Sequence, residues 1–150
     1  MMIAAIGFMK YPKHYRLEYV KDFYDAISNF EINLPTPIMA GLRTPVKQFS
    51  SCVTIQVGDS LNSISAATTA SMKYISQKAG LGLDVGKIRA INSEIRGGDA
   101  EHTGLIPFIR LLQSAVKSCS QGGVRGGAAT VHIPVWHYEF PELVVLKNNR

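Results

Sequence analysis

The chain has 150 residues, 46% of them hydrophobic, which is enough for one domain with a packed core. Its formal net charge of +5 suits an anionic partner, and a phosphorylated small molecule fits as well as nucleic acid does. Two cysteines exclude a disulfide scaffold and favour reduced thiols in a cytoplasmic protein. The apolar residues 1–9 are too short for a membrane span and lack the basic region of a signal peptide, so we interpret them as part of a buried helix.

The first half of the chain alternates helical and extended patterns. Apolar residues at helical spacing predict an amphipathic helix over residues 13–30. Two prolines in residues 34–39, LPTPIM, favour extended backbone, and the β-rich residues 49–57 predict a buried strand that ends at Gly58. A second helix is predicted over residues 61–78, with Asp59 or Ser60 as its cap and Gly80 as its stop.

The second half continues the alternation. A short strand is predicted over residues 81–86 and a polar loop over residues 88–104. A third helix carries Pro107 in its first turn and runs to Ser118, an apolar strand follows over residues 128–136, and residues 142–150 form a strand or a short helix. This order predicts an α/β layer or barrel with parallel strands.

A glycine-rich segment over residues 118–130 separates the third helix from the last strand. Four glycines surround Arg125, and Gln121 stands just before them. Glycine lets the backbone approach a ligand closely and change shape, and the guanidinium fork suits a phosphate, a carboxylate or a base edge. The segment is therefore either a nucleotide-binding loop or a plain connector.

Other candidate residues each carry a structural alternative. Cys52 is either an inert core residue or a redox thiol facing a pocket, and the neighbouring serines are unusual for a dry core. Cys119 ends a helix, where the helix dipole does not activate a thiol, so we assign it a structural role. Two arginines of the 88–104 loop, Arg89 and Arg96, could clamp a polyphosphate or simply be solvated, and Asp59 could cap a helix or accept a ribose hydroxyl.

The remaining motif searches give no metal or nucleotide signature. His102, His132 and His137 form no tight cluster with cysteines or carboxylates, so we predict no metal site. Neither a GxxxxGK[ST] motif nor a GxGxxG motif after a strand is present.

Taken in order, several segments resemble the large (alpha) catalytic subunit of class I ribonucleotide reductase. They are LPTPIMAG at 34–41, QFSSC at 48–52, GDSL at 58–61, RA at 89–90, IRGG at 95–98, CSQGGVRGGAAT at 119–130 and LKNNR at 146–150. The resemblance covers nearly the whole chain. It implies an α/β fold, namely half of a ten-stranded α/β barrel with mostly parallel strands, preceded by one or two helices. Residues 1–33 would form the helical lead and residues 34–150 the first half-barrel with its nucleotide-binding loops.

The resemblance implies the activity of a ribonucleoside-diphosphate reductase, which makes deoxyribonucleotides for DNA synthesis by radical chemistry. Cys52 matches one of the two cysteines that supply electrons and become a disulfide. The residues that match substrate-binding positions are Thr36, Ser51, Ala79, Gly80, Leu81, Gln121 and Arg125. The residues that match positions holding a nucleotide effector (ATP, dATP, dTTP or dGTP) are Asp59, Arg89 and Arg96. Asp84 stands where an amide is common and adds a charge near the substrate wall.

The resemblance also implies partners and missing parts. No cofactor is expected on this chain, because a metal-containing small subunit supplies the radical. The radical cysteine and the second reducing cysteine would lie beyond Arg150, so we expect the chain alone to be inactive. The implied partners are the remainder of the large subunit, a second large subunit, the small subunit and thioredoxin or glutaredoxin, without nucleic acid or membrane.

Two alternatives to an enzyme remain open. Half a barrel could serve as an inactive nucleotide-binding or assembly module that needs a second chain for any activity. A nucleic-acid binder would rest on the charge of +5 alone, since no aromatic-basic motif supports it.

Overall fold

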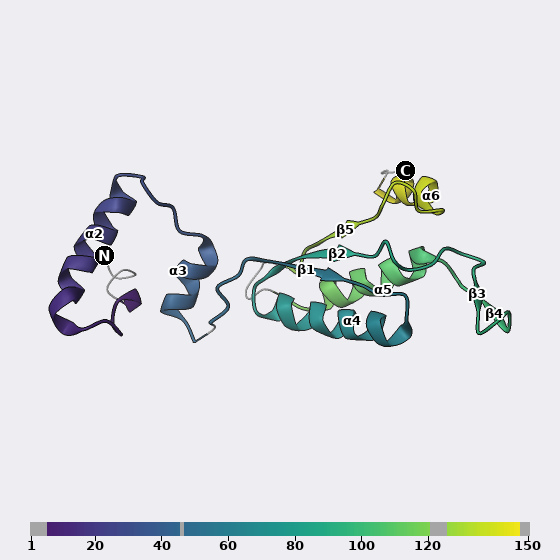
Figure 1. The fold of residues 1–150 in the computed structure, drawn as a ribbon, viewed down its shortest axis with the longest axis horizontal. Coiled ribbons are helices and arrows are strands. Elements are labelled where there is room, and N and C mark those ends of the chain that lie inside the picture. The colour runs from purple at the N-terminus through teal and green to yellow at the C-terminus, as the bar shows by residue number, and fades with distance from the viewer. Residues whose placement is uncertain (1–5, 46, 121–125, 148–150) are drawn as a thin grey trace. The chain divides into compact units, whose positions relative to one another are not determined.

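The computed structural model describes residues 6–45, 47–120 and 126–147, which divide into two compact units (Figure 1). The first unit is Met1–Ser51 and the second is Cys52–Arg150. Each unit is described by itself below. The proposed division of the sequence at residues 33 and 34 stays a prediction.

The first unit is helical. Helix α2 (Lys13–Ser28) confirms a helix over most of the predicted range 13–30, but none of its residues is buried, so a buried apolar face is not confirmed. The ring of Phe8, which precedes the helix, lies 5.3 Å from Tyr11, 5.6 Å from Tyr19 and 5.5 Å from Phe23 between ring centroids. The chain turns at residues 8–10, and Met9 is 61% exposed, so the prediction of a buried helix through residue 9 is wrong there. Residues 1–5 of that prediction lie outside the described residues.

The second helix of this unit corrects the prediction of extended backbone over residues 34–39. Helix α3 (Thr36–Arg43) begins after Pro35, which is its N-cap residue in extended conformation, and Pro37 stands in its first turn. A proline there removes no intrahelical hydrogen bond, because the first backbone N–H groups of a helix have no partner within it. The two prolines therefore mark a helix start.

The second unit is built on a parallel three-stranded sheet in the order β1-β2-β5, which confirms the predicted α/β class. Strands β1 (Cys52–Gln56) and β2 (Gly80–Asp84) pair from Cys52 opposite Gly80 to Gln56 opposite Asp84. Strand β5 (Ala129–His132) pairs with β2 from Ala129 opposite Leu81 to His132 opposite Asp84. Helix α4 (Leu61–Ser76) connects β1 to β2, and α5 (Leu105–Ser118) precedes β5; the two helices pack together beside the strands (Figure 1).

One face of this sheet is apolar and the other polar. Leu81 and Leu83 of β2 are buried, and Val53 and Ile55 of β1 pack against the core. The core consists of Val57, Ile64, Ala67, Ile75, Leu81, Leu83, Val85, Ile88, Leu105, Leu112, Val116 and Leu143. The alternate positions of β1, including Cys52, are exposed, so the prediction of a buried strand is wrong: Val53 and Ile55 are partly buried on one face, and the other face is exposed.

The ends of α4 follow local signals. The Ser60 side chain accepts a hydrogen bond from the backbone N–H of Ser63 at 3.1 Å, so Ser60 is the cap. The helix ends before Lys78, which takes a left-handed conformation with φ 73°, and Gly80 already belongs to β2. The predicted stop at Gly80 is therefore two residues late.

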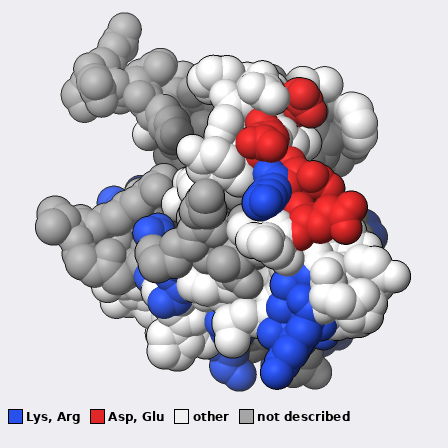
Figure 2. Space-filling view, turned by 90° about the vertical axis from the view of Figure 1, so that its left-hand side faces the viewer, with Lys and Arg blue, Asp and Glu red and all other residues white. Residues whose placement is uncertain are grey.

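The 88–104 loop contains a small antiparallel hairpin, β3 (Glu94–Ile95) with β4 (Ala100–Glu101). After β5 the chain forms helix α6 (Phe140–Val144) and the 3-10 turn η1 (Val145–Lys147), so the helical alternative for the end of the chain is correct over the described residues. None of the described helices is long and apolar enough to cross a membrane. On the face drawn in Figure 2, Lys and Arg side chains lie in several separate places and Asp and Glu side chains gather near some of them, so the described residues of this face form no single basic surface.

Candidate functional site

The polar face of the sheet places Cys52 beside a glycine backbone. Cys52 begins β1 and its thiol is exposed, which excludes the interpretation as an inert core residue within this unit. Its register partner on β2 is Gly80, so the thiol and a backbone without a side chain lie at the amino edge of the sheet. Ala79 and Leu81 flank that glycine but are buried, so only their backbone could meet a ligand.

Three further residues of the same face were not predicted as site residues from the sequence. Thr54, Gly82 and Thr130 occupy register positions across the three strands. A Cβ on Gly82 would lie 3.3 Å from the Nε2 atom of His132 and 3.5 Å from the hydroxyl of Thr54, so these polar groups close around the glycine. The signal was available: polar and apolar residues alternate with period two along β1, as in a strand with two different faces.

Asp84 ends the same face at the carboxyl edge. Its carboxylate accepts hydrogen bonds from the Gln56 amide at 3.1 Å and from the backbone N–H of Gly86 at 3.1 Å. These two hydrogen bonds, followed by the charges of His132 and Lys87, hold the pKa of Asp84 below the ordinary value of 3.8, against a smaller opposing effect of burial. The added charge therefore has hydrogen-bond partners, so it does not carry the free-energy cost of an isolated buried charge.

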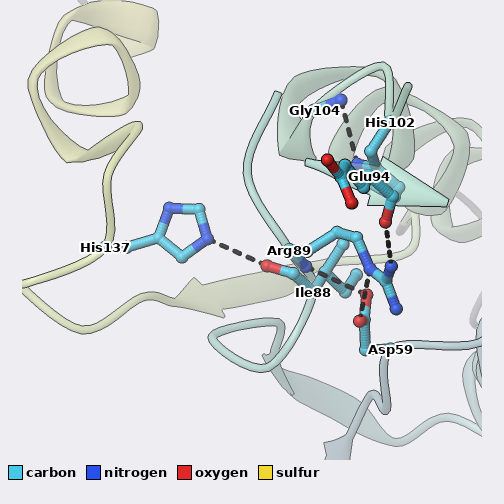
Figure 3. A network of polar contacts seen from close by, with 7 residues as sticks. All are labelled: Asp59, Ile88, Arg89, Glu94, His102, Gly104 and His137. Carbon is cyan, nitrogen blue, oxygen red and sulfur yellow. Dashed lines mark hydrogen bonds and ion pairs between the residues drawn. The ribbon is translucent and has the colours of Figure 1, made fainter. Parts of the chain in front are cut away.

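The effector candidates lie at the carboxyl edge, and two of them bind each other (Figure 3). The Arg89 Nε atom donates to Asp59 at 2.7 Å, the Arg89 backbone N–H donates to the same carboxylate at 3.0 Å, and Nη1 donates to the carbonyl of Glu94 at 2.8 Å. Ser60 caps α4, so capping does not explain Asp59. Arg96 is exposed in the turn of the β3–β4 hairpin with φ 54°, followed by Gly97 and Gly98 at positive φ.

The remaining candidates are not brought to these edges by any described contact. Thr36 is the first residue of α3 and Ser51 is exposed; both belong to the first unit. Gln121 and Arg125 lie outside the described residues. The base of their segment is described: Ser120 bridges to Gly126, and the Gly127 N–H donates to the Cys119 carbonyl at 3.3 Å.

A separate hollow of the second unit lies away from these residues. A groove of about 700 Å³ runs between α5, β5 and α6, lined mostly by apolar side chains, and none of the predicted site residues lines it. Among the described residues, no three His, Cys, Asp or Glu side chains lie close enough to hold a metal ion. The sheet thus places the thiol of Cys52 beside the backbone of Gly80 at its amino edge, and Arg89, hydrogen-bonded to Asp59, at its carboxyl edge.

Comparison with known proteins gives one consistent result. Residues 50–150 match the family described as ribonucleotide reductase, barrel domain. The whole chain is 63% identical to the ribonucleoside-diphosphate reductase subunit alpha of Haemophilus influenzae and 62% identical to the ribonucleoside-diphosphate reductase 1 subunit alpha of Escherichia coli. Over 135 residues it is 58% identical to the corresponding subunit of Enterobacteria phage T4. The chain spans 20% of the length of the two bacterial relatives and 18% of the phage relative.

Proposed function

This chain belongs to the ribonucleotide reductase family, in the barrel domain of the large subunit, and from that premise we propose that it forms part of a ribonucleoside-diphosphate reductase. The enzyme would reduce ribonucleoside diphosphates to 2′-deoxyribonucleoside diphosphates. The observation that carries the proposal is the exposed thiol of Cys52 at the amino edge of the sheet, opposite Gly80. The relatives are named as the alpha subunit of this enzyme, and the identity extends through that edge.

The thiol of Cys52 would act as a reductant of the ribose. Two thiols, Cys52 and a second one outside this chain, together give up two electrons and two protons and become a disulfide. The C2′–O bond of the ribose breaks, the oxygen leaves as water, and carbon 2′ gains a hydrogen, so atoms and electrons balance. A small subunit with a metal centre would supply the radical that starts the reaction.

The backbone of Gly80 would let the ribose of the substrate come close to the sulfur atom of Cys52. Gly80 has no side chain, and Ala79 and Leu81 turn theirs into the core, so the ligand would meet backbone at this edge. Thr36, Ser51, Gln121 and Arg125 complete the proposed substrate site on the strength of the family resemblance. Thioredoxin or glutaredoxin would re-reduce the disulfide.

The carboxyl edge would bind a nucleotide effector such as ATP, dATP, dTTP or dGTP. Arg89 and Arg96 would meet its phosphates, and Asp59 its ribose. Arg89 is held by Asp59 and by the Glu94 carbonyl, so its guanidinium is oriented before a phosphate arrives. A shape change of the 119–128 segment would then convey which effector is bound to the substrate site.

The open sides of the sheet support a larger barrel. Among the described residues, β1 and β5 are edge strands, and the apolar groove lies along β5. Edge strands pair on one side only within the described sheet, so edge strands with an apolar groove beside them suit continuation by further strands and helices. We therefore propose that the remainder of the large subunit completes the barrel, up to ten strands in all, and that a second large subunit and the small subunit join it.

The experiment compares Cys52→Ser with Cys119→Ser in the assembled reductase. Cys119 is the matched control, because it is the other cysteine of the chain, is half-buried after α5 and donates no electrons in the proposed reaction; turnover of both variants is measured without an effector, so that the proposed role of the 119–128 segment does not enter. We expect turnover of a ribonucleoside diphosphate to fall to background in C52S and to persist in C119S. Turnover in C52S at the unaltered rate would reject the proposed role. Calorimetric titration with dTTP tests the carboxyl edge separately, and no binding would reject the effector assignment.

A further inference from the structure

A buried carboxylate joins three parts of the second unit that are distant in sequence. Glu139 is 6% exposed and lies in the turn before α6. Its Oε2 atom accepts hydrogen bonds from the backbone N–H of Ile91 at 3.0 Å and from the backbone N–H of Leu105 at 2.8 Å. Ile91 lies near the start of the 88–104 loop, and Leu105 directly follows its end. One oxygen atom therefore ties both ends of that loop to the segment after β5.

The partners of this carboxylate suit its charge. Leu105 is the first residue of α5, where free N–H groups and the helix dipole favour an anion. The N-cap residue of α5 is Gly104, which has no side chain to accept a hydrogen bond, so Glu139 supplies the missing acceptor. Gly104 also has φ 90°, and a Cβ on it would lie 2.7 Å from the Oε1 atom of Glu139. The glycine thus makes room for the carboxylate.

A histidine two residues earlier strengthens the same attachment. The Nδ1 atom of His137 accepts the backbone N–H of Glu139 at 3.2 Å, so the proton of the neutral ring lies on Nε2. That atom contacts the carbonyl oxygen of Ile88 at 2.9 Å and donates to it (Figure 3). The residues between and beside them face outward: Trp136 is 81% exposed and Tyr138 is 92% exposed. The segment therefore turns its two hydrogen-bonding side chains toward the loop.

We infer that Glu139 is a positioning residue that fixes the two ends of the 88–104 loop and thereby sets the geometry of the effector-binding arginines. Arg89 lies between the two attachment points Ile88 and Ile91, so its backbone is held on both sides. The inference rests on the proposed function, because it assigns an effector to that loop. Glu139 touches no reacting atom in this proposal. It acts through the backbone that carries Arg89.

The test uses the assembled reductase with three variants of Glu139 and one control. Glu139→Ala removes the acceptor, Glu139→Asp retracts it by one methylene, and Glu139→Gln keeps an acceptor oxygen in place without the charge. Glu142→Ala is the matched control, because Glu142 is an exposed carboxylate three residues further on. Two readouts are taken: hydrogen exchange at the amides of Ile91 and Leu105, and the Kd for dTTP alongside the KM for a ribonucleoside diphosphate.

We expect exchange at the Ile91 and Leu105 amides to be about tenfold faster or more in E139A and E139D, as for a lost hydrogen bond to a charged group, and partly restored in E139Q, which keeps the acceptor but not the charge. The Kd for dTTP should rise in E139A and fall back toward the original value in E139Q, while the KM for substrate stays within about twofold. E142A should match the unaltered protein. If E139A does not fold, E139D against E139Q carries the same comparison.

Two results would overturn the inference. One is unchanged exchange at both amides in E139A and E139D. The other is an equal acceleration throughout β1 and β2, which would show general destabilisation. If the unaltered enzyme binds no dTTP, the effector assignment of the proposed function fails, whereas the exchange comparison still decides whether Glu139 fixes the loop.

Discussion

Replacing Gly127 by alanine should destabilise the second unit where the glycine-rich segment enters β5. A Cβ at this position would collide with the backbone carbonyl oxygen of Val116, lie 2.8 Å from the Cγ2 atom of Ile75 and lie 3.2 Å from the carbonyl oxygen of Cys119. Two of these atoms belong to backbone at the end of α5, which cannot move aside as a flexible side chain can. Overpacking of a tight site costs about 1–3 kcal/mol, and the upper end applies here.

A smaller opposing effect comes from the unfolded chain. Alanine restricts it more than glycine does and contributes about 0.4–1 kcal/mol of stability. The net expectation for G127A is a loss of about 2 kcal/mol, which for a protein of this size lowers Tm by roughly 4–8 °C.

The neighbouring glycine provides the matched control. A Cβ on Gly126 would meet no atom within 4 Å, so Gly126→Ala should leave Tm unchanged or raise it slightly. Thermal unfolding followed by circular dichroism measures both variants under the same conditions. Equal Tm values for G127A and G126A would show that the end of α5 yields to the added carbon, and the argument from close approach would be refuted.

Three further changes test other contacts. Ser60→Ala removes the cap of α4 and should lower the free energy of unfolding by about 1 kcal/mol in urea. Asp84→Asn should lower the free energy of unfolding at pH 7. Because folding lowers the pKa of Asp84, the carboxylate stabilises the protein above pH 3.8, and this stabilisation is lost as the pH falls through the lower pKa of the folded state. The free energies of unfolding of D84N and the unaltered protein should therefore converge at low pH. Gly104→Ala combines positive φ with a contact to Glu139 and should cost about 1–3 kcal/mol, measured by urea unfolding.

Each of these changes has a control in the same chain. Ser65→Ala alters an exposed serine within α4 and should leave stability unchanged or slightly raised, so an equal loss in both serine variants would contradict capping. Gly98→Ala shares the positive φ, 99°, but its Cβ would meet nothing within 4 Å. An equal decrease in the free energy of unfolding in G98A and G104A would show that a clash with the Glu139 carboxylate does not contribute. A difference between D84N and the unaltered protein that grows as the pH falls from 7 to well below 3.8 would contradict a lowered pKa of Asp84 in the folded state.

The sequence predicts those elements whose signals are local. The sequence narrows the cap of α4 to Asp59 or Ser60, places the end of α5 at Ser118 and predicts parallel strands, because these features follow from neighbouring residues and from the alternation of helices and strands. The start of α3 was missed because Pro37 was taken to break a helix, although the first turn tolerates proline as well there as at Pro107. The stop of α4 was missed because Lys78, without the freedom of glycine, takes the left-handed conformation.

For the candidate site, the sequence identifies single residues, whereas the structure is needed to show which of them are neighbours. Cys52 and Gly80 were each singled out from the sequence, and only the sheet register shows that they are neighbours. The pairing of Asp59 with Arg89 joins residues thirty positions apart, and no spacing rule predicts it. Glu139 gave no signal at all, since its partners are backbone N–H groups 34 and 48 residues earlier. Long-range contacts of backbone with side chain leave no pattern in one sequence.

Helix α5 is the element that directly joins the two proposed ligand loops. Its first residue, Leu105, directly follows the 88–104 loop at the carboxyl edge of the sheet, and its last turn leads into the 119–128 segment at the amino edge. At about 1.5 Å per residue, its 14 residues separate the edges by roughly 20 Å, so one nucleotide diphosphate cannot bridge them. If these proposed sites are coupled within one chain, the coupling would require displacement of a packed element. Helix α5, held by Glu139 at one end and by buried Leu112 and Val116 along its length, would transmit such a displacement as a unit.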